Sequence, residues 1–221
     1  MLIPIIVVSS ISTAFYFIAK RSRKFKKTLT LNGFEVSESY PKYIENICKE
    51  IFDSPIRSGF YYRSRINSEW GADSWIVDID KGGADAPSCQ VLITDKNFTS
   101  FPEFALALTD GIPRIGRLFK FFDQLEKPFE KAGFHLLSEF SQPFFQKRKG
   151  IVVYAKEEFD MKPVIPPCVL DDLRSGGYRG LAFYKKRIIV WTYAEANPDK
   201  LFAIAKGMSE CFQVKSSVFK T

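Results

Sequence analysis

The chain has 221 residues, of which 46% are hydrophobic and 22 are phenylalanine. This composition is typical of a folded protein and excludes a mostly disordered one. The formal net charge is +7, from 32 Lys and Arg against 25 Asp and Glu. A basic excess of this size would suit nucleic-acid binding if the folded part carried it.

The excess charge is instead concentrated near the N-terminus. Residues 1–34 contain no acidic residue and six basic ones, which are Lys20, Arg21, Arg23, Lys24, Lys26 and Lys27. Without these six, 26 basic residues remain against 25 acidic ones. The folded part is therefore nearly neutral, which argues against a nucleic-acid partner. We expect the six residues to lie at a membrane surface, where each gains on the order of 1 kcal/mol from anionic lipid headgroups.

An apolar run without charged side chains extends from Leu2 to Ala19. As a helix it would be roughly 27 Å long, close to the roughly 30 Å of a bilayer core. A secretory signal peptide carries its positive charges before the apolar stretch and a cleavage site after it. Here the basic flank follows the run, at Lys20. We therefore predict a transmembrane anchor over residues 1–19, embedded in the bilayer through residues 2–19, with a buried core helix or a transit peptide as the alternatives.

The basic flank also predicts the orientation of the chain. Lys and Arg resist transfer across the membrane, so the side that carries them stays in the cytoplasm. We expect a single-pass protein of the cell (inner) membrane with its N-terminus outside and its C-terminal domain cytoplasmic. The predicted organisation is an anchor over 1–19, a basic juxtamembrane segment over 20–34 and one globular domain over 35–221.

The first half of the globular part predicts one helix followed by strands. Apolar residues at helical spacing predict an amphipathic helix over residues 41–53. Residues 58–66, 75–80 and 89–94 are rich in β-formers and are separated by turn signals, which predicts an antiparallel meander. Residues 101–108 form a further expected strand, since Phe104, Leu106 and Leu108 fall on one face.

A second helix is expected over residues 115–131. Its apolar stripe is flanked by basic residues, so it could lie in a membrane interface, but packing against a sheet is the favoured interpretation. Pro128 is expected to kink this helix or end it early.

The C-terminal third predicts a strand over 151–155, a short helix over 167–173 and a hairpin. The hairpin arms are residues 178–184 and 187–193, joined at Lys185 and Lys186. A last helix is expected to begin at Asn197 and Pro198. The predicted class is α+β, a largely antiparallel sheet covered by helices. The order of elements suggests a duplicated unit or a pleckstrin-homology-like closure, although no internal repeat is apparent.

Catalytic signatures are absent from the sequence. It contains no P-loop, no dinucleotide-binding glycine motif, no nucleophile elbow and no HExxH. The single histidine, His135, lies in an apolar strand-like context that favours a structural or surface role. Asp171 and Asp172 are adjacent in sequence, so they point different ways on a helix and suit a solvated helix end. Residues 174–177 could form an anion nest, but a glycine turn before a hairpin is favoured.

No metal site, cofactor site or catalytic residue is predicted. The four cysteines are at least 41 residues apart, which excludes a CxxC centre and suits buried thiols in a reducing compartment.

The layout resembles that of bacterial single-pass membrane proteins for which no activity is established. The resemblance rests on the N-terminal anchor with its basic flank, LNGFEV at residues 31–36, FPEFAL at residues 101–106, and the late hairpin with its terminal helix. It covers most of the chain. It implies a membrane-tethered cytoplasmic domain and transfers no site residues.

The favoured function is a non-enzymatic, membrane-anchored binding or scaffold module whose partner is a membrane protein or a lipid headgroup. The alternative is a membrane-bound hydrolase or transferase that uses carboxylates such as Asp171 or Asp172 with His135. A third hypothesis is a small subunit of a larger membrane complex.

Overall fold

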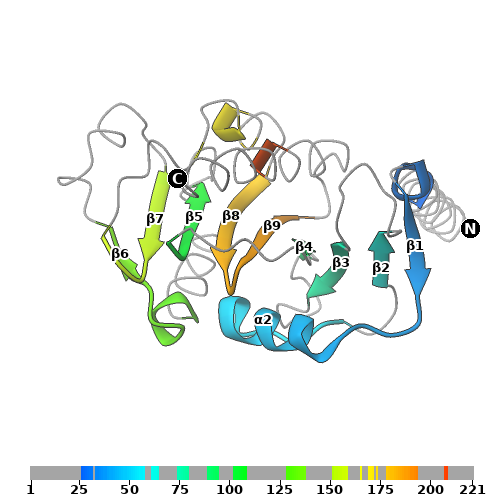
Figure 1. The fold of residues 1–221 in the computed structure, drawn as a ribbon, viewed down its shortest axis with the longest axis horizontal. Coiled ribbons are helices and arrows are strands. Elements are labelled where there is room, and N and C mark those ends of the chain that lie inside the picture. Colours follow the sequence, from blue (N-terminus) through cyan, green and yellow to red (C-terminus); the bar gives the residue numbers. More distant parts are fainter. Residues whose placement is uncertain are drawn as a thin grey trace, which may run out of the picture.

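Nine strands form one sheet in the computed structural model (Figure 1), in the order β1-β2-β3-β4-β9-β8-β5-β7-β6. The strands are β1 (Phe34–Ser37), β2 (Tyr61–Ser64), β3 (Ser74–Ile79), β4 (Cys89–Thr94), β5 (Phe104–Leu108), β6 (His135–Leu136), β7 (Ile151–Ala155), β8 (Tyr178–Tyr184) and β9 (Arg187–Tyr193). The structure describes residues 26–31, 33–57, 61–64, 74–79, 89–94, 102–108, 128–137, 151–158, 165, 169–171, 173, 178–193 and 207–208.

Every strand pairing in this sheet is antiparallel. The predicted meander is present as β2, β3 and β4, and the predicted hairpin as β8 and β9, with Tyr184 paired to Arg187 across the two-lysine turn. The α+β class with a largely antiparallel sheet is thereby confirmed. β1 and β6 are the two edge strands of the described sheet, so it is open rather than closed in the pleckstrin-homology manner.

Both faces of the sheet are buried, which explains why its strands are so apolar. Side chains alternate along a strand, so Trp75, Val77 and Ile79 of β3 belong to one core cluster and Ile76 to the other. In β5 the predicted common face is confirmed: Phe104, Leu106 and Leu108 lie in the same core cluster.

Helix α2 (Lys42–Phe52) covers one of these faces and confirms the predicted amphipathic helix. Its buried residues are Ile44, Ile47, Cys48, Ile51 and Phe52. The helix ends where Asp53 adopts a left-handed conformation with φ 47° and its N–H donates to the Lys49 carbonyl. Phe129, from the helical residues 128–131, packs on the same face.

The opposite face is covered by three other segments. They are residues 26–31 through Leu29, residues 169–173 through Val169, Leu170 and Leu173, and Met208. In Figure 1, α2 lies below the sheet, while residues 169–173 and 207–208 lie above it.

Several predictions fall partly or wholly outside the described residues. They include the apolar run 2–19, residues 115–127 of the second helix and the start of the last helix at Asn197. The kink or early end expected at Pro128 stays a prediction, because residues 128–131 are helical, with the Ala132 N–H donating to the Pro128 carbonyl at 2.9 Å, but the residues before Pro128 lie outside the described ranges. Within the described ranges, no helix is long and apolar enough to cross a membrane. Cys48 and Cys89 are buried free thiols.

Candidate functional site

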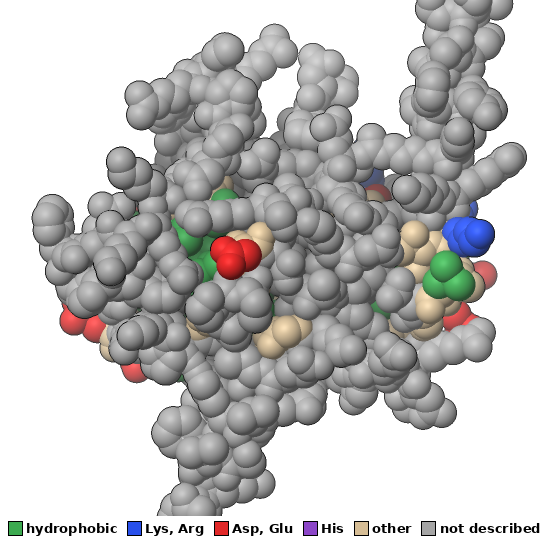
Figure 2. Space-filling view, turned by 90° about the horizontal axis from the view of Figure 1, so that it is seen from above, with side chains coloured by type: hydrophobic (Ala, Val, Ile, Leu, Met, Phe, Trp, Pro, Cys, Tyr) green, Lys and Arg blue, Asp and Glu red, His purple; other side chains and the backbone are tan. Residues whose placement is uncertain are grey.

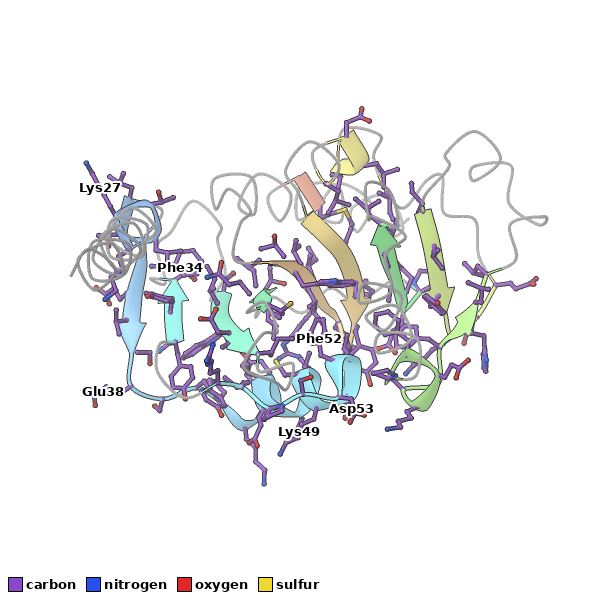
Figure 3. All side chains as sticks on the ribbon, turned by 180° about the vertical axis from the view of Figure 1, so that it is seen from behind. Lys27, Phe34, Glu38, Lys49, Phe52 and Asp53 are labelled. Carbon is purple, nitrogen blue, oxygen red and sulfur yellow. The ribbon has the colours of Figure 1, made fainter. Side chains whose placement is uncertain are left out.

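The last two of the six predicted membrane-surface residues lie on a short helix over residues 26–31. Lys26 and Lys27 are both exposed, and Figure 3 shows Lys27 extending away from the domain. The Thr30 hydroxyl donates to the Lys26 carbonyl at 3.0 Å, one turn away. Lys20, Arg21, Arg23 and Lys24 lie outside the described residues.

This basic helix is attached firmly to the sheet. Leu29 is 1% exposed and belongs to the same core cluster as Phe34. Gly33 has φ 78° and donates its N–H to the Thr30 carbonyl at 3.0 Å, a left-handed turn that suits glycine and stops the helix. β1 follows at once and pairs with β2. A buried leucine and a paired strand therefore hold the helix in place.

The domain boundary predicted between residues 34 and 35 stays a prediction. Leu29 and Phe34, on the anchor side of that boundary, are both buried in the domain core. Part of the basic segment, residues 26–31, thus packs on the sheet through Leu29.

Exposed apolar side chains accompany the lysines at this edge of the sheet. Leu31, at the end of the helix, is 77% exposed, and Val36 of the edge strand β1 is 60% exposed. Figure 2 shows a Lys or Arg side chain beside a hydrophobic one at this end of the molecule. The third large exposed hydrophobic residue among those described is Leu136 of β6, on the opposite edge.

The structure separates the residues of the enzymatic alternative. His135 lies on β6, as its strand-like context predicted, and is exposed. Asp171 is exposed within the helical residues 169–171, above the strands in Figure 1, whereas β6 lies at one edge of the sheet. Asp172 and residues 174–177 lie outside the described part of the chain. Among the described residues, no group of three or more His, Cys, Asp or Glu could hold a metal ion.

A row of polar side chains across three neighbouring strands was not predicted. Asp78 pairs with Gln90, and Gln90 pairs with Thr192, so the three residues follow one another across β3, β4 and β9. Burial raises the pKa of the Asp78 carboxyl, while its hydrogen bond to Gln90 and the nearby Arg57 act in the opposite direction. The available signal was a carboxylate inside the otherwise apolar strand sequence SWIVDI.

The turn between β8 and β9 was predicted at Lys185 and Lys186, but the carboxylates that surround it were not. Lys185 and Lys186 both have positive φ, at 48° and 63°, which is the pattern of a type I′ hairpin turn. Left-handed backbone costs a lysine roughly 1–2 kcal/mol. Glu103 offsets part of this strain, because its carboxylate accepts the Lys185 N–H at 2.6 Å.

Glu50 of α2 joins the same turn from the side. It accepts hydrogen bonds from the Tyr184 hydroxyl at 3.0 Å and from Lys185 Nζ at 2.7 Å. Burial raises the pKa of Tyr184, and the Glu50 carboxylate raises it further. Lys156 pairs with Glu103 at 2.7 Å and lies over the Tyr184 ring. The cluster links α2, the start of β5, the end of β7 and the hairpin, so it has a structural role.

No protein family model matches this chain, and no curated protein matches it. Among solved structures, the fold is similar to the crystal structure of the mycobacterial trehalose monomycolate transport factor A, TtfA. The TM-score is 0.54 at 10% sequence identity, over 88% of this chain and 95% of that one. At this identity the similarity shows a shared fold.

Proposed function

We propose that this protein is a membrane-anchored binding or scaffold module of the inner membrane, with its folded domain in the cytoplasm. The observation that carries the proposal is the firm attachment of the basic helix, because Leu29 and β1 make residues 26–31 part of the domain. A chain anchored before Lys26 would hold the domain at a fixed place beside the bilayer rather than on a long flexible tether. Such confinement raises the effective concentration of the domain toward other membrane components.

The structural neighbour supports this proposal in a general way. TtfA is described as a transport factor for trehalose monomycolate, which is a lipid. A membrane-associated role is compatible with a shared fold. The hydrolase or transferase alternative has less support, since β6, which carries His135, and the helical residues 169–171, which include Asp171, lie in different parts of the fold (Figure 1).

The orientation is tested with reporters fused after Thr221 of the full chain. We expect a cytoplasm-active reporter to be functional and an export-active reporter to be silent, because the basic flank retains its side of the membrane. Activity of the export-active fusion alone would contradict the proposal. Neutralising all six basic residues should scramble the orientation, whereas neutralising the exposed Lys42, Lys49 and Lys186 should not.

The scaffold role is tested by crosslinking the full chain in native membranes and identifying what copurifies in mild detergent. Copurification of a membrane protein in a stoichiometric amount would support a binding module. The same result would also be expected if the chain is a small subunit of a larger membrane complex. Recovery of the chain alone, with and without crosslinker, would count against a protein partner.

A further inference from the structure

We propose that the β1 edge of the domain itself rests on the bilayer, with Leu31 and Val36 inserted among the lipid headgroups of an anionic membrane. This inference rests on the proposed function and deepens it, because it names the surface through which the folded domain meets the membrane. The patch consists of Lys26, Lys27, Leu31 and Val36, and is called the β1-edge patch below.

The first support is the composition of the patch. Of the three large exposed hydrophobic residues in the described part of the chain, Leu31 and Val36 lie only five positions apart, beside two exposed lysines. Apolar side chains next to basic ones are the combination found on protein surfaces that bind anionic lipid. An anionic bilayer matches both kinds of side chain, because its headgroups are negatively charged and its interior is apolar.

The second support is the reach of the chain. The apolar run ends at Ala19 and the described helix begins at Lys26, seven peptide steps later. Seven steps span at most roughly 25 Å when fully extended. Because Leu29 packs the helix over residues 26–31 on the domain, the Lys26 end of the patch lies within this distance of the point where the predicted anchor leaves the bilayer.

The acidic residues at the same edge indicate how the domain is tilted relative to the bilayer. Glu35 lies on β1 between Phe34 and Val36 and so points to the other face of the strand from Val36. Glu38 lies beyond the end of β1, and Figure 3 shows it at the opposite end of the strand from Lys27. The Lys27 end of β1 therefore faces the lipid, and the Glu38 end is turned away.

The far edge of the sheet offers a matched control. Leu136 is 59% exposed, similar to Val36, but it lies on β6. Eight strand spacings separate β1 from β6, and at about 4.8 Å each they amount to roughly 38 Å. A domain that rests on β1 holds Leu136 far from the lipid.

The test places an environment-sensitive fluorophore at one position of the full chain, in the variants Leu31→Cys, Val36→Cys and Leu136→Cys. Each variant is reconstituted into vesicles of phosphatidylcholine and phosphatidylglycerol with or without a lipid nitroxide quencher. The unaltered chain, labelled in parallel, gives the background from its native cysteines. Leu31→Trp with brominated lipid repeats the measurement without a label.

We expect quenching several-fold stronger at positions 31 and 36 than at position 136, and strongest at 31. Vesicle-bound protein with equal quenching at all three positions would overturn the β1-edge patch while leaving the anchor intact. A full chain that does not float with vesicles at all would overturn the membrane anchoring as well, so the two failures are distinguishable.

Discussion

Replacing Leu29 with alanine tests whether the basic helix is truly part of the domain. Leu29 is 1% exposed and packs in the same core cluster as Phe34, and a buried Leu→Ala substitution costs about 2–5 kcal/mol of unfolding free energy. We expect about 2–3 kcal/mol, because the helix over 26–31 is short and its other side chains are mostly exposed. A helix of this length is marginal by itself, so its order depends on Leu29.

Leu31→Ala is the control, since it removes the same atoms from the same helix. Leu31 is 77% exposed, and we expect a change within about 0.5 kcal/mol. Urea unfolding of the full chain in mild detergent measures both variants through the fluorescence of the buried Trp75 and Trp191. Trypsin cleavage after Lys26 and Lys27 reports detachment of the helix and should accelerate only in Leu29→Ala. Identical behaviour of the two variants in both assays would refute the rigid attachment.

Two further substitutions test the sheet. At Gly180 a Cβ would collide with the Trp191 ring and lie 2.5 Å from the Leu106 carbonyl oxygen, so Gly180→Ala should destabilise the protein by about 3 kcal/mol, the upper end of the usual cost of overpacking. Gly207→Ala is the milder control, because the nearest atom to its added Cβ is Val169 Cγ2 at 3.2 Å, and equal melting temperatures of the two variants would contradict the packing. Burial raises the pKa of the Asp78 carboxyl in the folded protein above the ordinary value of 3.8. Between 3.8 and this raised pKa, the folded protein holds a proton that the unfolded chain has released, so stability is lost as the pH rises from 3.8 through the raised pKa. Asp78→Asn should therefore raise the melting temperature at neutral pH, with a gain that shrinks toward pH 3.8; a gain independent of pH would show that ionisation of Asp78 is not responsible.

Local patterns in the sequence predicted the elements whose contacts are mainly local. α2 was readable because five buried residues recur on one face, and the β8–β9 hairpin because two β-rich arms flank a two-residue turn. β1 was missed although its four residues, FEVS, alternate between apolar and polar, because the run is short and crosses the boundary predicted between the basic segment and the globular domain. The helix over residues 26–31 was not predicted, because Lys26 and Lys27 at its start were assigned to the basic juxtamembrane segment.

The order of the strands in the sheet could not be predicted from local sequence patterns. β5 lies between β7 and β8, and β4 pairs with β9, but nothing in either strand specifies its neighbour. The polar row of Asp78, Gln90 and Thr192 becomes visible only when these pairings set the residues side by side. The six proposed membrane-surface residues were predicted from the charge distribution of the sequence. Leu31 and Val36 could be selected only once the structure showed which apolar residues are exposed.

The β4–β9 pairing also determines when the protein can fold. Leu92 pairs with Val190, about 100 residues later, so the central contact of the sheet has high contact order and closes slowly. At translation rates of about 5–20 residues per second, the meander β2–β4 waits on the order of 5–20 s before β9 is synthesised. Through that interval one edge of β4 has no β9 beside it, whereas the anchor proposed for residues 1–19 would already have been synthesised. Under the proposed function, the unfinished sheet of this chain would lie next to a bilayer with the edge of β4 still unpaired, the kind of edge that is prone to pair with another chain.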